Sequence, residues 1–465
     1  MGRTLAINPV TRIEGHARVN LEIDDAKTIT GSCFQVMDFR GFETFLQGMQ
    51  VEMMPAITPR ICGTCPQTHH LVAARAVDKV YQAAIPRPAW LQRAILNAGG
   101  IIHSHAIHFF MLAGPDLLFG LDSDPAQRNI VGIAQAHPDK AKMAIRLRAI
   151  GHKICEEVGG RGTHPVTQIA GGAAAPLEAD KIATLKQYAQ EALALCKELY
   201  EFATSILEGN TDLVQSLPLE TAYLGTVKGG VFDLYDGDLR LTGADGTFFE
   251  FSEDAWTDHI VEGVTDGSYG KPTVFKTGSE SIAYRVGPLA RMNCAESIDT
   301  PLANGELAKF KHNYGSPCHQ TVLYNQARLI ELLYSVEKLN ELINDPELAS
   351  DNIRARLGTP RNAAAHVEAP RGVLIHDYQV DENAIVTKAN LLVATQQNLG
   401  AINETIKMSA QKFIDQKDEL LLNAVEFAIR CYDPCLSCAT HRIGQMKMQV
   451  TITHNGSAIR HLRRS

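Results

Sequence analysis

Two pairs of cysteines have a spacing that suits metal or redox chemistry. The first is Cys62 and Cys65, in Cys-Gly-Thr-Cys, and the second is Cys435 and Cys438, in Cys-Leu-Ser-Cys. Each pair lets two thiolates reach one soft metal ion, so both together could form a four-sulfur site for zinc, iron or nickel. Compact zinc sites have their second pair about 15 to 20 residues after the first, whereas some 370 residues separate these two. Spacing alone leaves structural zinc, a reactive metal and disulfide redox chemistry as interpretations.

The composition is that of a globular protein without affinity for nucleic acids. Of 465 residues, 45% are hydrophobic and 21% are charged, which is enough for a full core. The 44 basic and 52 acidic residues give a formal net charge of -8, and no basic stripe occurs, which argues against nucleic acid as a partner. Length alone predicts roughly three domain-sized units of about 150 residues.

The N-terminus lacks the apolar core of a signal peptide, and we expect a cytoplasmic protein. One stretch, Ala94 to Pro115, runs for 22 residues without Asp, Glu, Lys or Arg and is long enough to span a bilayer. It contains His103, His105 and His108, whose imidazoles would be costly in lipid. We therefore expect a core helix and no membrane span.

Periodic apolar side chains predict that long helices carry most of the fold. Between Lys181 and Leu207 they recur every three or four residues, after Asp180 as the predicted N-cap and before Gly209 near the helix end. Similar patterns predict helices over residues 90–112, 126–157, 320–343 and 401–429.

Strands are predicted in two places. Residues Ala17 to Ile23 alternate between apolar and polar side chains. Between Tyr223 and Phe251, short apolar runs alternate with Gly-Gly and Asp-Gly turns, which predicts a small β-rich insertion at about 220–290. The expected fold class is α+β and predominantly helical. No phosphate-binding glycine motif occurs, so no nucleotide site is predicted.

The residues around both cysteine pairs resemble the signatures of a known family. Arg60 begins RICGTCPQTHH, and His441 ends DPCLSCATH. These segments are similar to RxCGxCxxxH and DPCxxCxxH of the [NiFe] hydrogenase large subunit. Further motifs of that family occur in the expected order: Arg12-Ile-Glu14-Gly15-His16, Arg40-Gly-Phe-Glu43, His105-Ala-Ile-His108 leading to Asp116, Gly159-Gly-Arg161-Gly-Thr-His164-Pro165 and Ala369-Pro-Arg371-Gly. By this resemblance the chain is identified as a member of the family, and the fold of that subunit is expected.

The resemblance implies a use for the four cysteines. In the family, nickel binds all four, and the second cysteine of each pair also bridges to an iron that carries carbonyl and cyanide. Cys62 and Cys435 would then be terminal nickel ligands, and Cys65 and Cys438 would bridge. Heterolytic cleavage of hydrogen needs a Lewis acid for the hydride, a base for the proton and an exit for electrons. Cys435 would accept the proton, and Glu14 would carry it onward.

Other residues match groups that surround this centre in the family. Arg371 matches an arginine that bonds one cyanide, and Thr395 a Ser or Thr that donates to the other. His69 matches a histidine that donates toward a cysteine sulfur, although His70 beside it leaves the register open by one. Two carboxylates match the canopy over the open coordination site, Asp116 and Asp433.

A magnesium site is also implied beneath the metal centre. Glu43 and His441 match two of its ligands, and the backbone carbonyl of Leu391 is the expected third. Mg²⁺ prefers oxygen ligands, so the histidine is the unusual member of this set.

In the family the chain is cut after the second signature once metal is installed. The cut would fall between His441 and Arg442, and a maturation protease is therefore an expected partner. A single catalytic domain, residues 1–441, would remain after loss of the propeptide 442–465, because cysteine pairs at opposite ends must meet in one core. The tail carries five basic and no acidic side chains. A terminal strand is the alternative, since Met446 to Ile452 partly alternates.

The chain has no further cysteine set for an iron–sulfur cluster, and no flavin site is expected in it. The resemblance therefore implies an Fe–S small subunit, docked around the N-terminal motifs, and further electron-transfer subunits of the heterodisulfide reductase type. The segments CGTCPQTHH, EAPRGVLIHDY and DPCLSCATH look most like the cytoplasmic group 3, in its methyl-viologen-reducing branch that does not reduce deazaflavin. The deazaflavin- and NAD-reducing branches are alternatives.

Two other classes share the fold. A metal-free subunit of respiratory complex I has an electron-coupling role, but such relatives lack the cysteine pairs. Hydrogen-sensing regulatory proteins share the metal site, but they generally lack the cleaved tail. The sequence favours the catalytic subunit over both.

Overall fold

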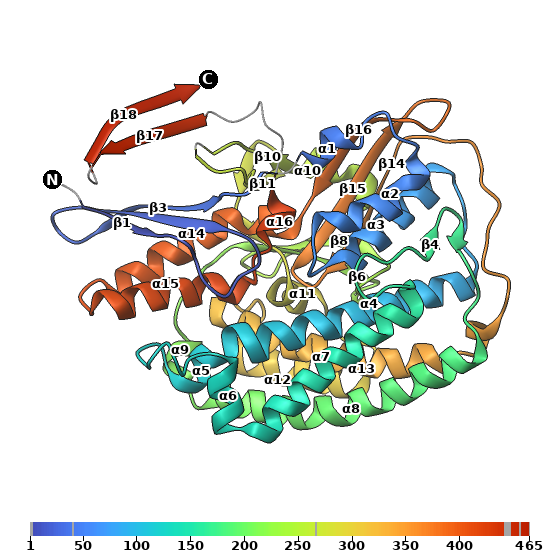
Figure 1. Ribbon diagram of the computed structural model, residues 1–465, viewed down its shortest axis with the longest axis horizontal. Helices are drawn as coiled ribbons and strands as arrows, with labels where there is room; N and C mark the ends of the chain where they lie inside the picture. Colours follow the sequence, from blue (N-terminus) through green and yellow to red (C-terminus); the bar gives the residue numbers. More distant parts are fainter. Residues whose placement is uncertain (1–2, 40, 266, 441–447, 455–456, 465) are drawn as a thin grey trace.

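Four long helices form one layer of the molecule, at the bottom of Figure 1. They are α4 (Arg87–Ile107), α7 (Pro138–Gly159), α8 (Ala179–Glu208) and α13 (Tyr324–Ile343). Helices α4 and α8 each pack against both α7 and α13, so the apolar stripe of each helix finds a partner. The computed structural model describes residues 3–464 apart from 40, 266, 441–447 and 455–456.

Two antiparallel sheets, each of three strands, lie above this helical layer in Figure 1. One follows the order β1 (Arg3–Ile7), β2 (Ala17–Ile23) and β3 (Ile29–Val36). The other follows the order β14 (Ala363–Ala369), β15 (Gly372–Val380) and β16 (Val386–Leu392). The strand expected at Ala17 to Ile23 is thus confirmed as β2.

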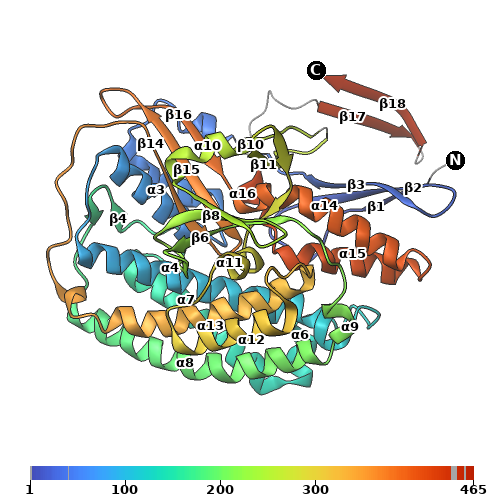
Figure 2. The same ribbon diagram turned by 180° about the vertical axis from the view of Figure 1, so that it is seen from behind.

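Smaller strands fill the stretch between Ala222 and Arg285, where the β-rich insertion is predicted (Figure 2). One sheet has the order β13-β6-β8-β9 with β7 beside β6, and a second has the order β10-β11-β12. Their bounds are β6 Ala222–Lys228, β7 Val231–Phe232, β8 Asp238–Thr242, β9 Phe248–Phe251, β10 Ile260–Glu262, β11 Thr273–Thr277, β12 Glu280–Ile282 and β13 Tyr284–Arg285. A short pair, β4 (Gln168–Ile169) and β5 (Gly172–Ala173), precedes them. The α+β, predominantly helical fold class is confirmed.

The remaining helices connect these layers, and α3 and α16 carry the cysteine signatures. The α-helices are α1 Phe42–Phe45, α2 Met54–Ile57, α3 Pro66–Val80, α5 Gly114–Phe119, α6 Ile130–Ala136, α9 Thr211–Val214, α10 Trp256–His259, α11 Pro288–Cys294, α12 Pro301–Tyr314, α14 Ala394–Phe413, α15 Asp418–Tyr432 and α16 Leu436–Ala439. The 3₁₀ helices are Val51–Met53, Thr58–Ile61, Glu253–Ala255, Thr321–Leu323 and Pro346–Ala349, and a π-helical turn spans His108–Ala113.

Two segments that were each predicted as one helix contain two helices in the structure. The prediction over 126–157 divides into α6 and α7 at Pro138, because proline has no N–H to continue the first helix and favours the first turn of the next. The prediction over 401–429 divides into α14 and α15, which pack against each other across a short turn. Helix α8 begins two residues before the predicted range and ends one residue after it, and its N-cap is Glu178 rather than Asp180, which lies in the first turn.

Within the described residues, the segment Arg87–Phe119 is the one helix long and apolar enough to cross a membrane. Its most apolar window is 83% buried inside the molecule. The expected core helix over Ala94 to Pro115 is found there, as α4 and the π-helical turn that follows it.

The tail after the second cysteine signature contains two strands. They are β17 (Met448–His454) and β18 (Ser457–Arg464), which pair antiparallel with each other. The alternative prediction for the tail, a strand over Met446 to Ile452, therefore matches β17 from Met448 to Ile452. The predicted cleavage site at His441 and Arg442 lies outside the described residues.

A buried ion network joins the helical layer to the sheet above it. The guanidinium of Arg291 on α11 donates to both carboxylate oxygens of Glu331 on α13, at 2.6 Å each. It also donates to Glu368 on β14 at 2.6 Å. All three side chains are fully buried, and His105 Nε2 lies 2.9 Å from Glu331. One cation thus neutralises two carboxylates from different layers.

Replacing Arg291 by methionine should destabilise the fold strongly. The substitution leaves two carboxylates buried without their cation, which lowers the free energy of unfolding by about 3–5 kcal/mol. The control is Arg146→Met, because Arg146 forms an exposed pair with Glu191 worth less than about 1 kcal/mol. Urea unfolding of the purified protein measures both, and equal losses would contradict this role for the network.

Candidate metal centre

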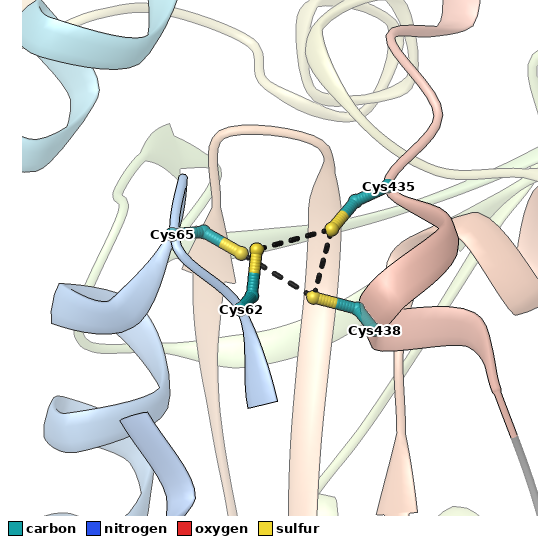
Figure 3. Close-up of side chains that lie close together, drawn as sticks. All are labelled: Cys62, Cys65, Cys435 and Cys438. Carbon is teal, nitrogen blue, oxygen red and sulfur yellow. Dashed lines mark hydrogen bonds between the residues drawn. The ribbon is translucent and has the colours of Figure 1, made fainter. Parts of the chain in front are cut away.

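Four buried sulfur atoms from opposite ends of the chain meet at one point (Figure 3). The Sγ atom of Cys435 lies 3.2 Å from that of Cys62 and 3.0 Å from that of Cys438, and Cys65 lies 3.4 Å from Cys438. All four sulfurs are within 4.8 Å of one another. A disulfide has a bond of about 2.05 Å, so these are four free thiols that converge as the ligands of one site do.

Local backbone geometry aims each pair at this point. The 3₁₀ turn Thr58–Ile61 ends at Cys62, which is extended, and Cys65 is the N-cap of α3 with Pro66 at the first helical position. At the other end, α15 stops at Asp433, which has the left-handed conformation (φ 54°), and Cys435 then precedes α16. The backbone thus changes direction sharply at both cysteine pairs, and the two pairs face each other across the metal site.

The electrostatics of the cluster favour a bound cation. Burial, then hydrogen bonds within the cluster, raises the pKa of Cys435 well above its usual value, and burial likewise raises that of Cys438. Hydrogen bonds from Cys435 and Cys438 lower the pKa of Cys65 to about 7. For Cys62 burial opposes ionisation, but hydrogen bonds from Cys435 and Cys438 still lower its pKa well below the usual value. Four thiolates cannot coexist here without a metal, because each repels the others in a buried space.

The donor set fits the expected soft metal. Thiolates select nickel, zinc and iron, and sulfur atoms this close can all bond one ion at the usual distance of about 2.3 Å. A small cavity of about 20 Å³ adjoins Cys65 and Cys438 and is also lined by Arg371 and Thr395. This cavity touches both cysteines that are predicted to bridge to iron, and it touches Cys435 as well.

Glu14 reaches the cluster from the N-terminal end of the chain. Its Oε2 atom lies 3.0 Å from Cys435 Sγ and accepts the backbone N–H of Ser437 at 3.0 Å, and the Ser437 hydroxyl donates to its Oε1. Backbone pairing between Glu14 and Cys435 fixes the approach. Gly15, with φ at +80°, permits it, since a Cβ there would lie 2.7 Å from Leu436 Cβ.

Arg371 and Asp433 form a buried ion pair against the cluster. Arg371 Nε donates to the Asp433 carbonyl at 2.6 Å, and Nη2 donates to its carboxylate at 3.0 Å. Burial raises the pKa of Asp433, while the charge of Arg371 opposes that shift. The second Asp433 oxygen is buried without a partner among the described residues. Thr395 lies next to them, and its hydroxyl oxygen accepts the backbone N–H of Cys435 at 2.8 Å.

The structure distinguishes the two adjacent histidines. His69 Nε2 lies 3.3 Å from Cys438 Sγ, whereas His70 contacts the Pro55 carbonyl at 2.6 Å and the Gln168 N–H at 2.9 Å. Of the two, His69 is therefore the one in contact with a cysteine sulfur. Burial lowers the pKa of His70 to about 4, so it is a neutral core residue.

Asp116 is surrounded by arginines. Its carboxylate pairs with Arg12, with Arg430 at 2.8 Å and with Arg128 at 3.2 Å, and it is completely buried. None of these contacts involves a cysteine of the cluster, so its place in a canopy over the metal stays a prediction.

Glu43 and Leu391 lie together below the cluster. Glu43 Oε1 accepts the backbone N–H of Leu391 at 3.3 Å, and both line a cavity of about 10 Å³ that also touches Cys438. The third predicted magnesium ligand, His441, lies outside the described residues.

Sequence reasoning missed Ser437, which holds both oxygens of Glu14, and Thr64, whose hydroxyl lies 3.1 Å from Cys62 Sγ. Both stand inside the cysteine signatures, and their position there was the available signal. The other six cysteines are not part of the cluster, and burial raises the pKa of each of them.

Comparison with known proteins identifies the family. A family described as "Nickel-dependent hydrogenase" matches residues 40–129 and 271–441, and one described as "HoxL-like" matches residues 4–39. The chain is 39% identical over 460 residues to the vhc F420-non-reducing hydrogenase chain of Methanococcus voltae, covering 95% of each. It belongs to the nickel-dependent hydrogenase large-subunit family. The expected family is thereby confirmed, and the chain is an oxidoreductase that acts on hydrogen.

Two further relatives extend this result. The NAD-reducing hydrogenase HoxS subunit beta of Cupriavidus necator is 36% identical to this hydrogenase, with 97% of each chain covered. A solved NAD⁺-reducing [NiFe]-hydrogenase in the H2-reduced state superposes with a TM-score of 0.91 and 34% identity, over 94% of this chain and 99% of that one. The large-subunit fold predicted from the signatures is confirmed.

Removing one cluster sulfur should abolish nickel retention. Loss of outer-shell partners typically lowers metal affinity about 10–100-fold, so Cys62→Ala, which removes a predicted ligand, should reduce the nickel content of the purified protein by more than tenfold. Cys196→Ala is the matched control, because Cys196 is equally buried but lies on α8 away from the cluster. Elemental analysis measures both, and a normal nickel content in Cys62→Ala would refute the site.

Proposed function

We propose that this chain cleaves H2 heterolytically, with Cys435 as the first proton acceptor and Glu14 as the group that takes the proton onward. Cys62 and Cys435 would hold a nickel–iron centre as terminal ligands, with Cys65 and Cys438 as the bridging ligands, and that centre would supply the Lewis acid and the electron outlet. The observation that carries the proposal is the 3.0 Å contact between Cys435 Sγ and Glu14 Oε2.

The surroundings of Glu14 suit proton transfer. One oxygen faces the sulfur, and the two hydrogen bonds from Ser437 hold the carboxyl group in that orientation. Glu14 is only half-buried, so its other side is close to solvent. A proton received from Cys435 can therefore leave the buried cluster without a change of backbone conformation.

Arg371 and Thr395 suit the two proposed cyanide ligands of iron. Both line the cavity next to Cys65 and Cys438, and a guanidinium and a hydroxyl are donors that match anionic ligands. Asp433 acts on Arg371, because its two hydrogen bonds fix the guanidinium plane. His69 donates to the bridging sulfur of Cys438, and Asp116 holds Arg12 two residues before Glu14.

A magnesium ion beneath the centre is proposed at Glu43 and Leu391. A carboxylate oxygen and a backbone carbonyl are the hard donors that Mg²⁺ favours, and their cavity adjoins Cys438. His441 completes the proposed ligand set.

An Fe–S small subunit is proposed to dock beside this site. Four large apolar side chains between β3 and α2 are exposed by 39–57%: Met37, Phe39, Phe45 and Met53. Exposed apolar surface of this kind is typical of a protein interface, and the same stretch includes Glu43, which lines a cavity that also touches Cys438.

We infer the electron acceptor from the acceptors that the names of similar hydrogenases give. F420-non-reducing hydrogenases of about 40% identity favour the methyl-viologen-reducing branch, in the cytoplasm, with heterodisulfide reductase-type subunits as the next carriers. The NAD-reducing branch is the second candidate, because a relative of that kind reaches 36% identity. Hydrogen uptake by the native complex with viologen, NAD or deazaflavin as acceptor decides between them. A metal-free, complex I-like role has no support from a site with four convergent sulfurs.

Replacing Glu14 by glutamine should stop proton transfer but keep the metal. General acid–base groups contribute about 10²–10⁴-fold, so hydrogen/deuterium exchange should fall by at least about 100-fold while the nickel content stays normal. Glu306→Gln is the control, since Glu306 is a half-buried glutamate that bonds Tyr200 far along the chain. Exchange at the wild-type rate in Glu14→Gln would clear this residue of the role.

Active protein should end at His441. We propose that a maturation protease removes residues 442–465, because a chain that continues would keep His441 from closing the site beneath the cluster. Intact-mass measurement of the hydrogen-oxidising complex should therefore give a large subunit shorter by the tail, and full-length protein with full activity would refute cleavage.

A further inference from the structure

A file of three buried side chains leads away from the bridging sulfur of Cys438. His69 on α3 contacts the sulfur through Nε2 at 3.3 Å, and its Nδ1 lies 3.2 Å from Nε2 of His376. His376 Nδ1 in turn lies 2.7 Å from the hydroxyl of Tyr378. His376 and Tyr378 lie two apart on β15 and so share one face of the sheet. His69 is 1% exposed, and the other two side chains are completely buried.

One arrangement of protons satisfies every contact in this file. A metal-bound thiolate can only accept a hydrogen bond, so His69 Nε2 carries a proton and, in the neutral ring, Nδ1 accepts. His376 must then donate from Nε2, which leaves its Nδ1 as an acceptor. A tyrosine hydroxyl is a donor that can fill this position. All three donors therefore point the same way, toward the sulfur.

The opposite polarity is disfavoured by the burial of the file. It would require His376 to donate to Tyr378, and the tyrosine proton would then need another acceptor, which no contact among the described residues provides. Burial lowers the pKa of His376 well below its usual value, so the ring is neutral. Burial also raises the pKa of Tyr378 well above its usual value, so its hydroxyl keeps its proton.

We propose that Tyr378 and His376 are positioning residues, which fix the tautomer of His69 so that its Nε2–H always donates to the Cys438 sulfur. This inference rests on the proposed nickel–iron centre. A hydrogen bond to a ligating thiolate withdraws electron density from the metals, and outer groups that fix a histidine tautomer tune such sites. The file thus sets how strongly one bridging sulfur donates to the centre.

Four substitutions can distinguish this positioning role from a role in packing alone. Tyr378 fills the same space as phenylalanine except for its hydroxyl, so Tyr378→Phe removes the terminal donor and keeps the ring. His376→Ala removes the imidazole that connects His69 to Tyr378. His376→Gln returns an N–H donor close to the position of Nε2 and should restore the contact with His69. Tyr200→Phe is the matched control, since it removes a hydroxyl bonded to Glu306 on the distant α12.

The test is infrared spectroscopy of the intact hydrogenase complex, at equal nickel content for each variant. Tyr378→Phe should shift the iron carbonyl band to lower wavenumber, and His376→Ala should shift it further, because the sulfur becomes a stronger donor. His376→Gln and Tyr200→Phe should leave the band near its wild-type position. Unshifted bands in both Tyr378→Phe and His376→Ala would overturn the proposal, and Tyr378→Phe decides alone if His376→Ala does not fold.

If the proposed nickel–iron centre itself is wrong, the infrared spectrum shows this separately from any effect of the substitutions. If the wild-type complex shows no carbonyl or cyanide bands, the proposed iron ligands are wrong. The file is then judged by the thiolate-to-metal charge-transfer absorption, which Tyr378→Phe should move to longer wavelength. An unchanged absorption would overturn the file as a positioning device whichever metal ligands are present.

Discussion

Four thiols that cannot all ionise without a metal have to meet at a single buried point, and much of the structure follows from this constraint. They come from residues near the two ends of the chain, so the N-terminal strands, α3 and the segment after α15 must converge. One large cluster of buried apolar residues accordingly includes side chains from the N-terminal strands, from α3 and from α15, together with all four cysteines. The ion network around Arg291 serves the same need, because it holds the long helices and the β14–β16 sheet in fixed relation.

The same convergence places the proton and ligand groups. Backbone pairing of Glu14 with Cys435 ties the N-terminal motif to the C-terminal pair and delivers the carboxyl group to the sulfur in one contact. Gly15 makes the close approach possible, and Ser437 fixes the orientation. On the other side of the cluster, Asp433 orients Arg371 toward the small cavity next to the bridging cysteines. Chemistry and chain topology therefore depend on the same few contacts.

Sequence patterns and motifs predicted the class of fold, the cluster and several side chains next to it, but not most of the contacts that hold those side chains in place. Apolar periodicity marked α8 and α13 to within a few residues, whereas it ran across the breaks at Pro138 and between α14 and α15, since periodicity does not register a short turn. The cysteines were found because their spacing and neighbours are specific. The contacts of His69 with His376 join residues some 300 positions apart, and no local spacing encodes them. Likewise, Asp116 could be matched to a motif, but its three arginine partners could not be foreseen.

We propose that all four cysteines bind one nickel ion and that two of them also bind iron. X-ray absorption at the nickel edge of the purified complex measures this directly, because it reports the kinds and distances of atoms around nickel. We expect a first shell made of sulfur and a second, longer contact to iron. A shell of nitrogen and oxygen, or sulfur ligands with no iron neighbour, would contradict the account.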